Sequence, residues 1–435
     1  MASTFSFGFH GDDIDTDMDI DQAPEQQQRQ QPPNIHSAGH TSTINLIPAT
    51  LHRLDEWTST LPSQISYNTL TLPINASKDG GEGKIYLGRR EVFDIRTQLM
   101  AEDDDGDDDD EQNGTNSNDT TTPAPGAQRI RNKTLISGLE KGDLTPGVYE
   151  GGFKTWECAV YLASYLPKEE EEEGAGCLTK TAGNQAKGDE EEEWIDQVIE
   201  LGCGSAMPSL ALFARLLRDK RTRKTRRRTR FVLADYNDVV LRMVTIPNFI
   251  LTWWLNAQPH QDNSNDNNDD SGEGSDGLAL EGELDIDASL LEAFAADLAE
   301  LGITIDLISG AWSASFVDLV SRGGPDHSQA GSGRTLVLAS ETVYSPDSLV
   351  AFSDTLLAFL RWPRSRALVA AKKVYFGVGG GVDEFLHVLH QRKTPNEDVD
   401  AKSMTETSAD GVGRTILQVL VKSKSNTPGT ALANS

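Results

Sequence analysis

The chain has 435 residues, a formal net charge of −29 and 37% hydrophobic residues, enough to bury one sizeable core. No run reaches the about 18 consecutive apolar residues of a membrane-spanning helix, and no apolar signal segment follows Met1, so we expect a soluble, intracellular protein. The three cysteines form no C-x-x-C pair and the histidines form no H-E-x-x-H pair, which argues against a zinc site.

The negative charge is concentrated in segments that cannot bury enough apolar area to fold. These segments are the acidic runs 102–111, 169–173 and 189–193 and the polar stretch 258–287. We expect them to be solvated insertions, and we infer no basic partner from them. The predicted parts of the chain are a disordered acidic and Gln-rich tail at 1–45, a hairpin extension at 46–100, an acidic linker at 101–128, a main α/β domain at 129–422 with insertions at 167–193, 218–230 and 256–287, and a tail at 423–435.

Two strand-like segments, 67–72 and 84–87, flank a Gly-rich turn and predict a β-hairpin. Farther along, a turn-rich segment leads into a predicted helix at 154–166, whose apolar residues recur near helical spacing. We expect this helix to pack on a sheet ahead of the first strand. Trp156 and Glu157 at its start could close over a ligand, although a tryptophan at a helix start also commonly fills the core.

A cofactor loop is predicted where the apolar run 198–201 ends in Gly202-Cys203-Gly204 and a helix follows at about 205–217. The first glycine permits a tight turn, the second lets a ligand approach bare backbone, and the helix points its positive end at that ligand. The third glycine of the dinucleotide pattern is replaced by Met207. This departure favours a cofactor without phosphates, such as S-adenosylmethionine.

Three further buried-strand patterns, at 230–235, 303–308 and 335–339, end in polar residues or glycine. Ligands of open α/β sheets bind at the carboxyl ends of the strands, so we expect these strand ends to line one continuous binding crevice. Asp235 is placed to accept hydrogen bonds from both ribose hydroxyls. It lies farther along than the roughly 20 residues usual after such a loop, and we attribute the excess to a basic insertion at 218–230.

The carboxyl-terminal third supplies a predicted strand at 367–371, a glycine cluster at 377–381, a helix at 383–390 and a last strand at 415–421. The glycine cluster lacks the following Lys-Ser/Thr of a phosphate cradle, which argues against nucleotide hydrolysis. His387 and His390 lie three residues apart on the helix without a cysteine or carboxylate partner, so we expect surface histidines.

Six blocks of sequence carry a family resemblance. They are residues 149–158 (Tyr-Glu-Gly-Gly-Phe-Lys-Thr-Trp-Glu-Cys), 201–205, 235–237, 309–312, 340–344 and 375–381. Together they resemble the eukaryotic protein-histidine N-methyltransferases of the seven-β-strand, S-adenosylmethionine-dependent class, over residues 67–421 with the insertions excluded. The family's penultimate strand is replaced by polar residues between 391 and 413, so we expect a shortened sheet there.

The resemblance implies a class I, Rossmann-like α/β fold with S-adenosylmethionine as cofactor. It also implies methylation of a histidine in a large-subunit ribosomal protein, and residence in cytoplasm and nucleus. The candidate cofactor-binding residues are Trp156, Glu157, Gly202, Gly204, Asp235, Tyr236, Asn237, Gly310, Ala311, Trp312 and Ser340.

The chemistry of the acceptor indicates what the enzyme must supply. A neutral imidazole, with a pKa of about 6.5, already presents a nucleophilic lone pair, so the main task is to align it with the methyl group. A nearby carboxylate fixes the tautomer and stabilises the developing positive charge. We expect Glu341 to be this catalytic carboxylate and Tyr344 to shape the pocket. Glu341 as a helix-capping carboxylate remains an alternative.

Two other functions stay open at this point. Glu341-Thr342-Val343-Tyr344 also fits the acidic-x-x-Tyr signature of related protein-lysine methyltransferases. The basic run 218–230 is dense enough to contact RNA phosphates or to bind an import receptor, but it has no interleaved aromatics for base stacking. We therefore favour import or a solvated loop over RNA binding. A non-enzymatic scaffold is disfavoured because the cofactor positions are intact. The acceptor protein, the modified nitrogen and the oligomeric state are left open.

Overall fold

The computed structural model describes ten stretches of the chain. They are residues 46–75, 82–104, 125–140, 151–167, 195–223, 228–257, 280–324, 333–376, 379–408 and 411–424. The predicted tail at 1–45, most of the acidic linker, the acidic runs 169–173 and 189–193, and residues 149–150 and 377–378 of the family blocks lie outside the described residues.

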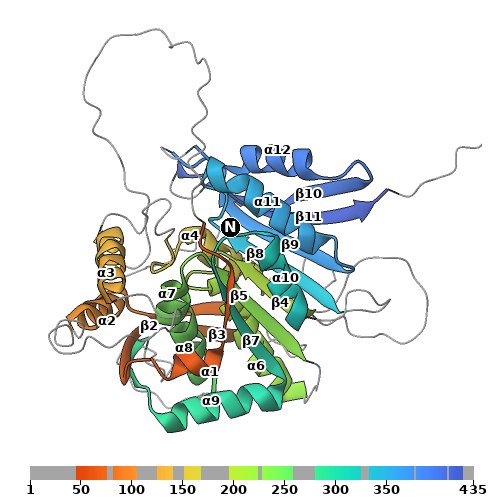
Figure 1. Cartoon of the computed structure of the whole chain (residues 1–435). Coiled ribbons are helices and arrows are strands. Elements are labelled where there is room, and N and C mark those ends of the chain that lie inside the picture. The colour runs from red at the N-terminus through yellow and green to blue at the C-terminus, as the bar shows by residue number, and fades with distance from the viewer. Residues whose placement is uncertain are drawn as a thin grey trace, which may run out of the picture.

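A twisted eight-stranded sheet forms the centre of the molecule (Figure 1). Its strands, in spatial order, are β1 (Thr50–His52), β7 (Ile303–Ser309), β5 (Thr229–Asp235), β4 (Ile195–Leu201), β8 (Arg334–Ser340), β9 (Ser365–Lys372), β11 (Arg414–Ser423) and β10 (Glu397–Thr407). The five strands from β7 to β9 are parallel, and β1, β11 and β10 each pair antiparallel with their neighbours. Without β1 this is a seven-stranded class I, Rossmann-like sheet, so the predicted fold class is confirmed.

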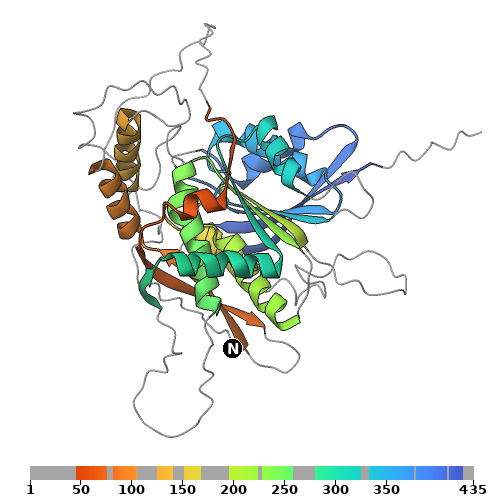
Figure 2. The same cartoon turned by 60° about the horizontal axis from the view of Figure 1, so that its bottom comes forward.

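Helices cover both faces of this sheet (Figures 1 and 2). One face packs against α4 (Glu157–Tyr165), α6 (Met207–Arg223), α8 (Ile246–Ala257) and α9 (Ala288–Leu301), and the other against α10 (Ala314–Gly323), α11 (Pro346–Leu360) and α12 (Val382–Arg392). Each face of the sheet has its own hydrophobic core, and successive residues of one strand pack into opposite cores. Val198 of β4 lies in the core on the first face, and Ile199 lies in the core on the second. Such two-sided burial explains the continuous apolar runs of the parallel strands.

A small second sheet is built on the predicted hairpin. β2 (Gln64–Asn75) pairs antiparallel with β3 (Glu82–Arg90), as predicted, and on its other side with β6 (Glu281–Asp285). The prediction of a solvated insertion over 256–287 was wrong for residues 281–285, because β6 is an edge strand in which only Leu284 is buried and its pattern carries little apolar signal.

Five further helical elements complete the described structure. They are α1 (Leu54–Thr58), α2 (Val92–Asp104), α3 (Pro125–Glu140), α7 (Asp238–Val240) and the π-helical turn η1 (Leu241–Thr245). The α2 and α3 helices pack with α7 and η1 around a third apolar cluster that includes Phe153.

Strand β10 contradicts the expected shortening of the sheet. It pairs with β11 from Glu397↔Ser423 to Thr407↔Arg414, with one irregularity between Ser403 and Thr405. Its polar composition suits a sheet edge, where charged residues discourage pairing with other chains. Only Val399 is buried, so the apolar pattern of an inner strand is missing.

The basic run 218–230 was predicted as an inserted loop, but both of its ends belong to regular secondary structure. α6 continues six residues beyond the predicted end at Leu217, to Arg223, and β5 already begins at Thr229. Lysine and arginine are good helix formers, and Arg215 pairs with Asp219 one turn on at 3.6 Å. Residues 224–227 lie outside the described residues.

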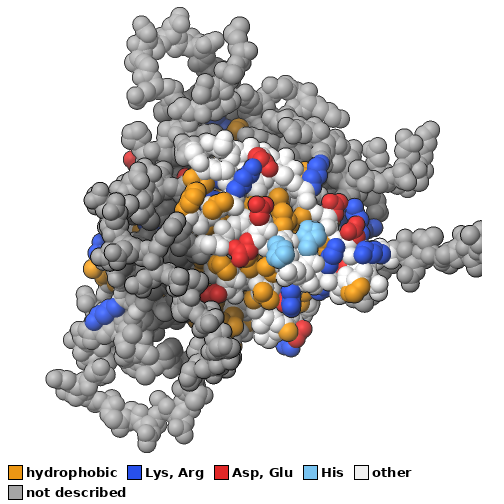
Figure 3. All heavy atoms as spheres, turned by 90° about the horizontal axis from the view of Figure 1, so that it is seen from above, with side chains coloured by type: hydrophobic (Ala, Val, Ile, Leu, Met, Phe, Trp, Pro, Cys, Tyr) orange, Lys and Arg blue, Asp and Glu red, His pale blue; other side chains and the backbone are white. Residues whose placement is uncertain are grey.

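The two histidines of the predicted helix at 383–390 are exposed, as expected. Figure 3 looks down on the molecule and shows two exposed histidine side chains beside each other among charged and hydrophobic groups. His387 and His390 are both exposed on α12, and among the described residues their rings bond within the helix, to the Gln391 side chain and the Leu386 carbonyl. Within the described ranges, no helix is both long enough and apolar enough to cross a bilayer.

Candidate functional site

The predicted cofactor loop lies at the carboxyl end of β4, where the sheet order reverses between β5 and β8. Gly202 and Gly204 have φ values of +64° and +48°, in the left-handed region that favours glycine. A Cβ at Gly202 would lie 2.9 Å from Cγ2 of Thr342, and one at Gly204 would lie 3.1 Å from Cα of Gly152. Both glycines are therefore required by the turn and by the close approach of neighbouring loops.

Asp235 ends β5 directly beside this loop. Its Oδ2 accepts a hydrogen bond from the Gly204 N–H at 3.0 Å, and its Oδ1 accepts one from the Asn237 N–H at 3.1 Å. These bonds fix the carboxylate at the strand end, where sequence placed the ribose ligand. Tyr236 follows half-buried, and Asn237 is buried at the start of α7.

The predicted residues after β7 contact the amino-terminal segment. The Gly310 N–H donates to the Asp235 carbonyl at 3.0 Å, which brings the ends of β5 and β7 together. Gly310 has a φ of +105°, and a Cβ there would collide with the Pro48 carbonyl. The Ala311 N–H donates to the Ile47 carbonyl at 2.9 Å. The sequence did not indicate this crossing segment, because its contacts, which include the hydrogen bond between His52 Nε2 and Ser309 Oγ at 2.7 Å, join residues far apart in the sequence.

Trp312 and Ser340 are the remaining predicted residues near the cofactor loop. The Trp312 ring packs on Phe352 with a centroid distance of 5.2 Å, and its Cζ2 lies 3.9 Å from the position of a Cβ on Gly202. Ser340 is the buried last residue of β8.

Glu200 was not among the predicted site residues. It is fully buried, and burial raises the pKa of its carboxyl to about 8. Its Oε2 accepts from the Ser209 N–H at 2.9 Å, in the first turn of α6, whereas Oε1 has no hydrogen-bond partner within the described part of the chain. The available signal was an acidic residue two positions before the first loop glycine, inside the otherwise apolar run 198–201.

Glu341 follows β8 and faces the start of α4. Its φ of +54° is rare for a residue other than glycine and marks local strain. Its Oε1 accepts from the Cys158 N–H at 3.3 Å, so this oxygen caps α4, as the helix-capping alternative proposed. Its Oε2 is buried and makes no hydrogen bond to any described residue. Glu341 therefore caps a helix with one oxygen, and its other oxygen has no hydrogen-bond partner among the described residues.

Two protonated groups lie beside the Glu341 carboxylate. Burial, and secondly the charge of Glu341, raise the pKa of the Cys158 thiol well above its usual value, and the same two causes raise the pKa of the Tyr375 hydroxyl. The Tyr375 ring meets Tyr344 edge to face with centroids 6.3 Å apart. The structure thus places the predicted Tyr344 at this site and adds Cys158 and Tyr375, which sequence reasoning missed.

Trp156 and Glu157 also lie at this end of the sheet. Trp156 is the N-cap residue of α4, and Glu157 forms ion pairs with Arg414 of β11 and, at 3.8 Å, with Lys372 of β9. All three charged side chains are largely buried. The pairs hold the start of α4 against the ends of β9 and β11, and contact of Glu157 with a cofactor stays a prediction. Among the described residues no group of three or more His, Cys, Asp or Glu side chains could hold a metal ion.

Curated relatives of this chain have a common name. Histidine protein methyltransferase 1 of Saccharomyces cerevisiae is 32% identical over 309 residues, which cover 68% of this chain and 67% of the relative. The protein of the same name from Schizosaccharomyces pombe is 32% identical over 358 residues, covering 82% and 80%. The mouse histidine protein methyltransferase 1 homolog is 30% identical over 283 residues, covering 64% and 59%. No protein-family model matches the chain.

Proposed function

The chain belongs to the histidine protein methyltransferase 1 family, and from this premise we propose that its acceptor is a histidine of a large-subunit ribosomal protein. The enzyme is a protein-histidine N-methyltransferase, and its cofactor is S-adenosylmethionine. When bound, this cofactor supplies an electrophilic methyl group on a sulfonium.

The residues at the strand ends fit such a cofactor. Glu200 has a buried carboxyl oxygen without a hydrogen-bond partner in the described chain, which suits a ligand that carries an ammonium group and a cationic sulfur. Asp235 places a second carboxylate beside the same loop, suited to ribose hydroxyls. Gly202 and Gly204 allow the tight turn that brings the loop beside these two carboxylates, since a Cβ at either position would crowd Thr342 or Gly152.

The buried Oε2 of Glu341 is the observation that supports a histidine acceptor most directly. Glu341 is joined to the cofactor loop through its neighbour Thr342, whose methyl group lies against Gly202. A single buried acceptor oxygen matches the single N–H of a neutral imidazole. By accepting that proton in a hydrogen bond, Glu341 would hold the tautomer whose other nitrogen is free to attack, and it would stabilise the ring as it becomes cationic.

The ribosomal acceptor and residence in cytoplasm and nucleus rest on the sequence resemblance. The basic run at the end of α6 supports the nuclear part, because a dense Lys/Arg segment suits an import receptor.

The test is methyl transfer with labelled S-adenosylmethionine to large-subunit proteins from cells that lack the enzyme. We expect label in methylhistidine at one site of one ribosomal protein. Label on a protein outside the ribosome would overturn the acceptor proposal, and label in methyl-lysine would overturn the histidine assignment.

A further inference from the structure

Helix α8 lies along the outer edge of β3, the edge that pairs with no strand. Three polar side chains of α8, one turn apart, meet alternate residues of β3. The Arg90 N–H donates to Asn248 Oδ1 at 2.8 Å, and the Gly88 N–H donates to Thr252 Oγ1 at 3.0 Å. Asn256 makes two bonds to Tyr86: its Oδ1 accepts from the Tyr86 N–H at 3.3 Å, and its Nδ2 donates to the Tyr86 carbonyl at 2.6 Å.

The spacing of these side chains along α8 matches the spacing of their partners along β3. Four residues of a helix rise about 6 Å, and two residues of a strand span about 6.6 Å. Polar side chains four apart on α8 can therefore bond backbone groups two apart on β3. Gly88 permits the close approach, because a Cβ there would collide with Leu251. This ladder covers an exposed strand edge and joins the small sheet to the main domain.

At one end the ladder reaches the cofactor loop. The Asn248 Nδ2 donates to the Ser205 carbonyl at 3.0 Å, and the preceding Gly204 carbonyl accepts from Thr245 Oγ1 of η1 at 2.7 Å. All four residues are buried. Because a trans peptide points its N–H opposite its carbonyl, the Thr245 bond turns the Ser205 N–H away from η1 and α8.

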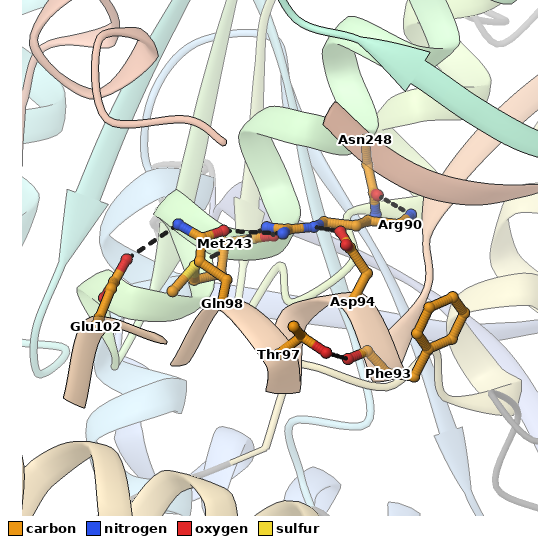
Figure 4. A network of polar contacts seen from close by, with 8 residues as sticks. All are labelled: Arg90, Phe93, Asp94, Thr97, Gln98, Glu102, Met243 and Asn248. Atoms are coloured by element: carbon orange, nitrogen blue, oxygen red, sulfur yellow. Dashed lines mark hydrogen bonds and ion pairs between the residues drawn. The ribbon is translucent and has the colours of Figure 1, made fainter. Parts of the chain in front are cut away.

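The Arg90 side chain makes several further polar contacts, which Figure 4 shows. The Arg90 guanidinium donates to Asp94 at 2.6 Å, to Gln98 at 2.8 Å and to the Met243 carbonyl at 3.0 Å. Since Arg90 N–H can only donate, it fixes Oδ1 of Asn248 on its side and directs the amide nitrogen at Ser205.

We propose that Asn248 is a positioning residue for S-adenosylmethionine: held in one orientation by β3, its amide fixes the Gly204–Ser205 turn in the shape that binds the cofactor. The small sheet thereby supports the cofactor loop across the domain. The proposal rests on the cofactor and not on the choice of acceptor, so cofactor binding alone tests it.

The test compares dissociation constants for S-adenosylmethionine, measured by calorimetry, between N248A and the matched control N256A. Each variant loses two side-chain bonds to the backbone of other elements, but only Asn248 contacts the loop. We expect N248A to bind about tenfold more weakly, the change expected for one hydrogen bond of ordinary strength, and N256A to bind as wild type. Equal weakening in both variants, or none in N248A, would overturn the proposal.

A second variant, N248D, tests the proposal if N248A does not fold. It keeps the side-chain oxygen that accepts from the Arg90 N–H. A neutral aspartic acid can still donate to the Ser205 carbonyl, whereas the carboxylate cannot. Position 248 is buried, and burial raises the pKa of a carboxyl group, so we expect the ratio of N248D to wild-type dissociation constants to rise as the pH increases from about 6 to about 9. A ratio that stays near one throughout would contradict the positioning role.

Discussion

Replacing Glu200 by glutamine should stabilise the protein in a pH-dependent way. The pKa of this carboxyl is about 8 in the folded chain against an ordinary value of 4.5, because burial disfavours the charged form. Between these values the unfolded chain has lost the proton that the folded chain retains, so the free energy of unfolding falls as pH rises. The difference corresponds to about 5 kcal/mol above pH 8 and about 3 kcal/mol at pH 7.

Glutamine does not titrate and can still accept from the Ser209 N–H through its amide oxygen. Urea denaturation of wild type and E200Q should therefore give similar free energies of unfolding near pH 4.5, with the variant becoming more stable as pH rises to about 8. A constant difference between the two proteins across this range would refute the argument that Glu200 is buried and neutral. E200Q should also bind S-adenosylmethionine more weakly, since the Glu200 carboxyl can lose its proton beside a cationic ligand whereas glutamine cannot.

Two further changes probe the acceptor site and the amino-terminal segment. Glu341→Gln keeps an oxygen for the Cys158 N–H but removes the charge. We therefore expect kcat to fall by about 10²-fold or more, while the dissociation constant of S-adenosylmethionine stays within about twofold of the wild-type value. Unchanged turnover in rapid single-turnover assays would leave Glu341 with a capping role only. Gly310→Ala should destabilise the protein by about 1–3 kcal/mol and speed amide exchange in Thr50–His52, because a Cβ at φ +105° meets the Pro48 carbonyl. Wild-type exchange in that strand would show that the segment does not require glycine.

The inner strands could be predicted from the sequence and the edge strands could not. β4, β5, β7, β8 and β9 are buried on both faces, so each is a nearly continuous apolar run. β10 and β6 have one solvent-facing edge and few buried side chains, and β1 has only three residues. Their positions depend on pairing partners distant in sequence, which local patterns do not contain.

The candidate site shows the same division. Sequence motifs were sufficient to predict Asp235, Glu341 and the loop glycines as site residues, because each of them directly follows or ends an apolar strand pattern. The sequence could not show that one oxygen of Glu341 caps a helix that begins 184 residues earlier, at Glu157. Nor could it show that one oxygen of Glu200 has no hydrogen-bond partner in the described part of the chain, or that Asn248 reaches both Arg90 and Ser205, since these depend on tertiary packing.

Calorimetric titration of S-adenosylhomocysteine into the wild-type protein and Asp235→Asn tests the cofactor site most directly. Saturable one-to-one binding to wild type, weakened about tenfold or more in the variant, is the result that the geometry at the ends of β4 and β5 predicts. Absence of binding to wild type, or equal binding to both proteins, would contradict it.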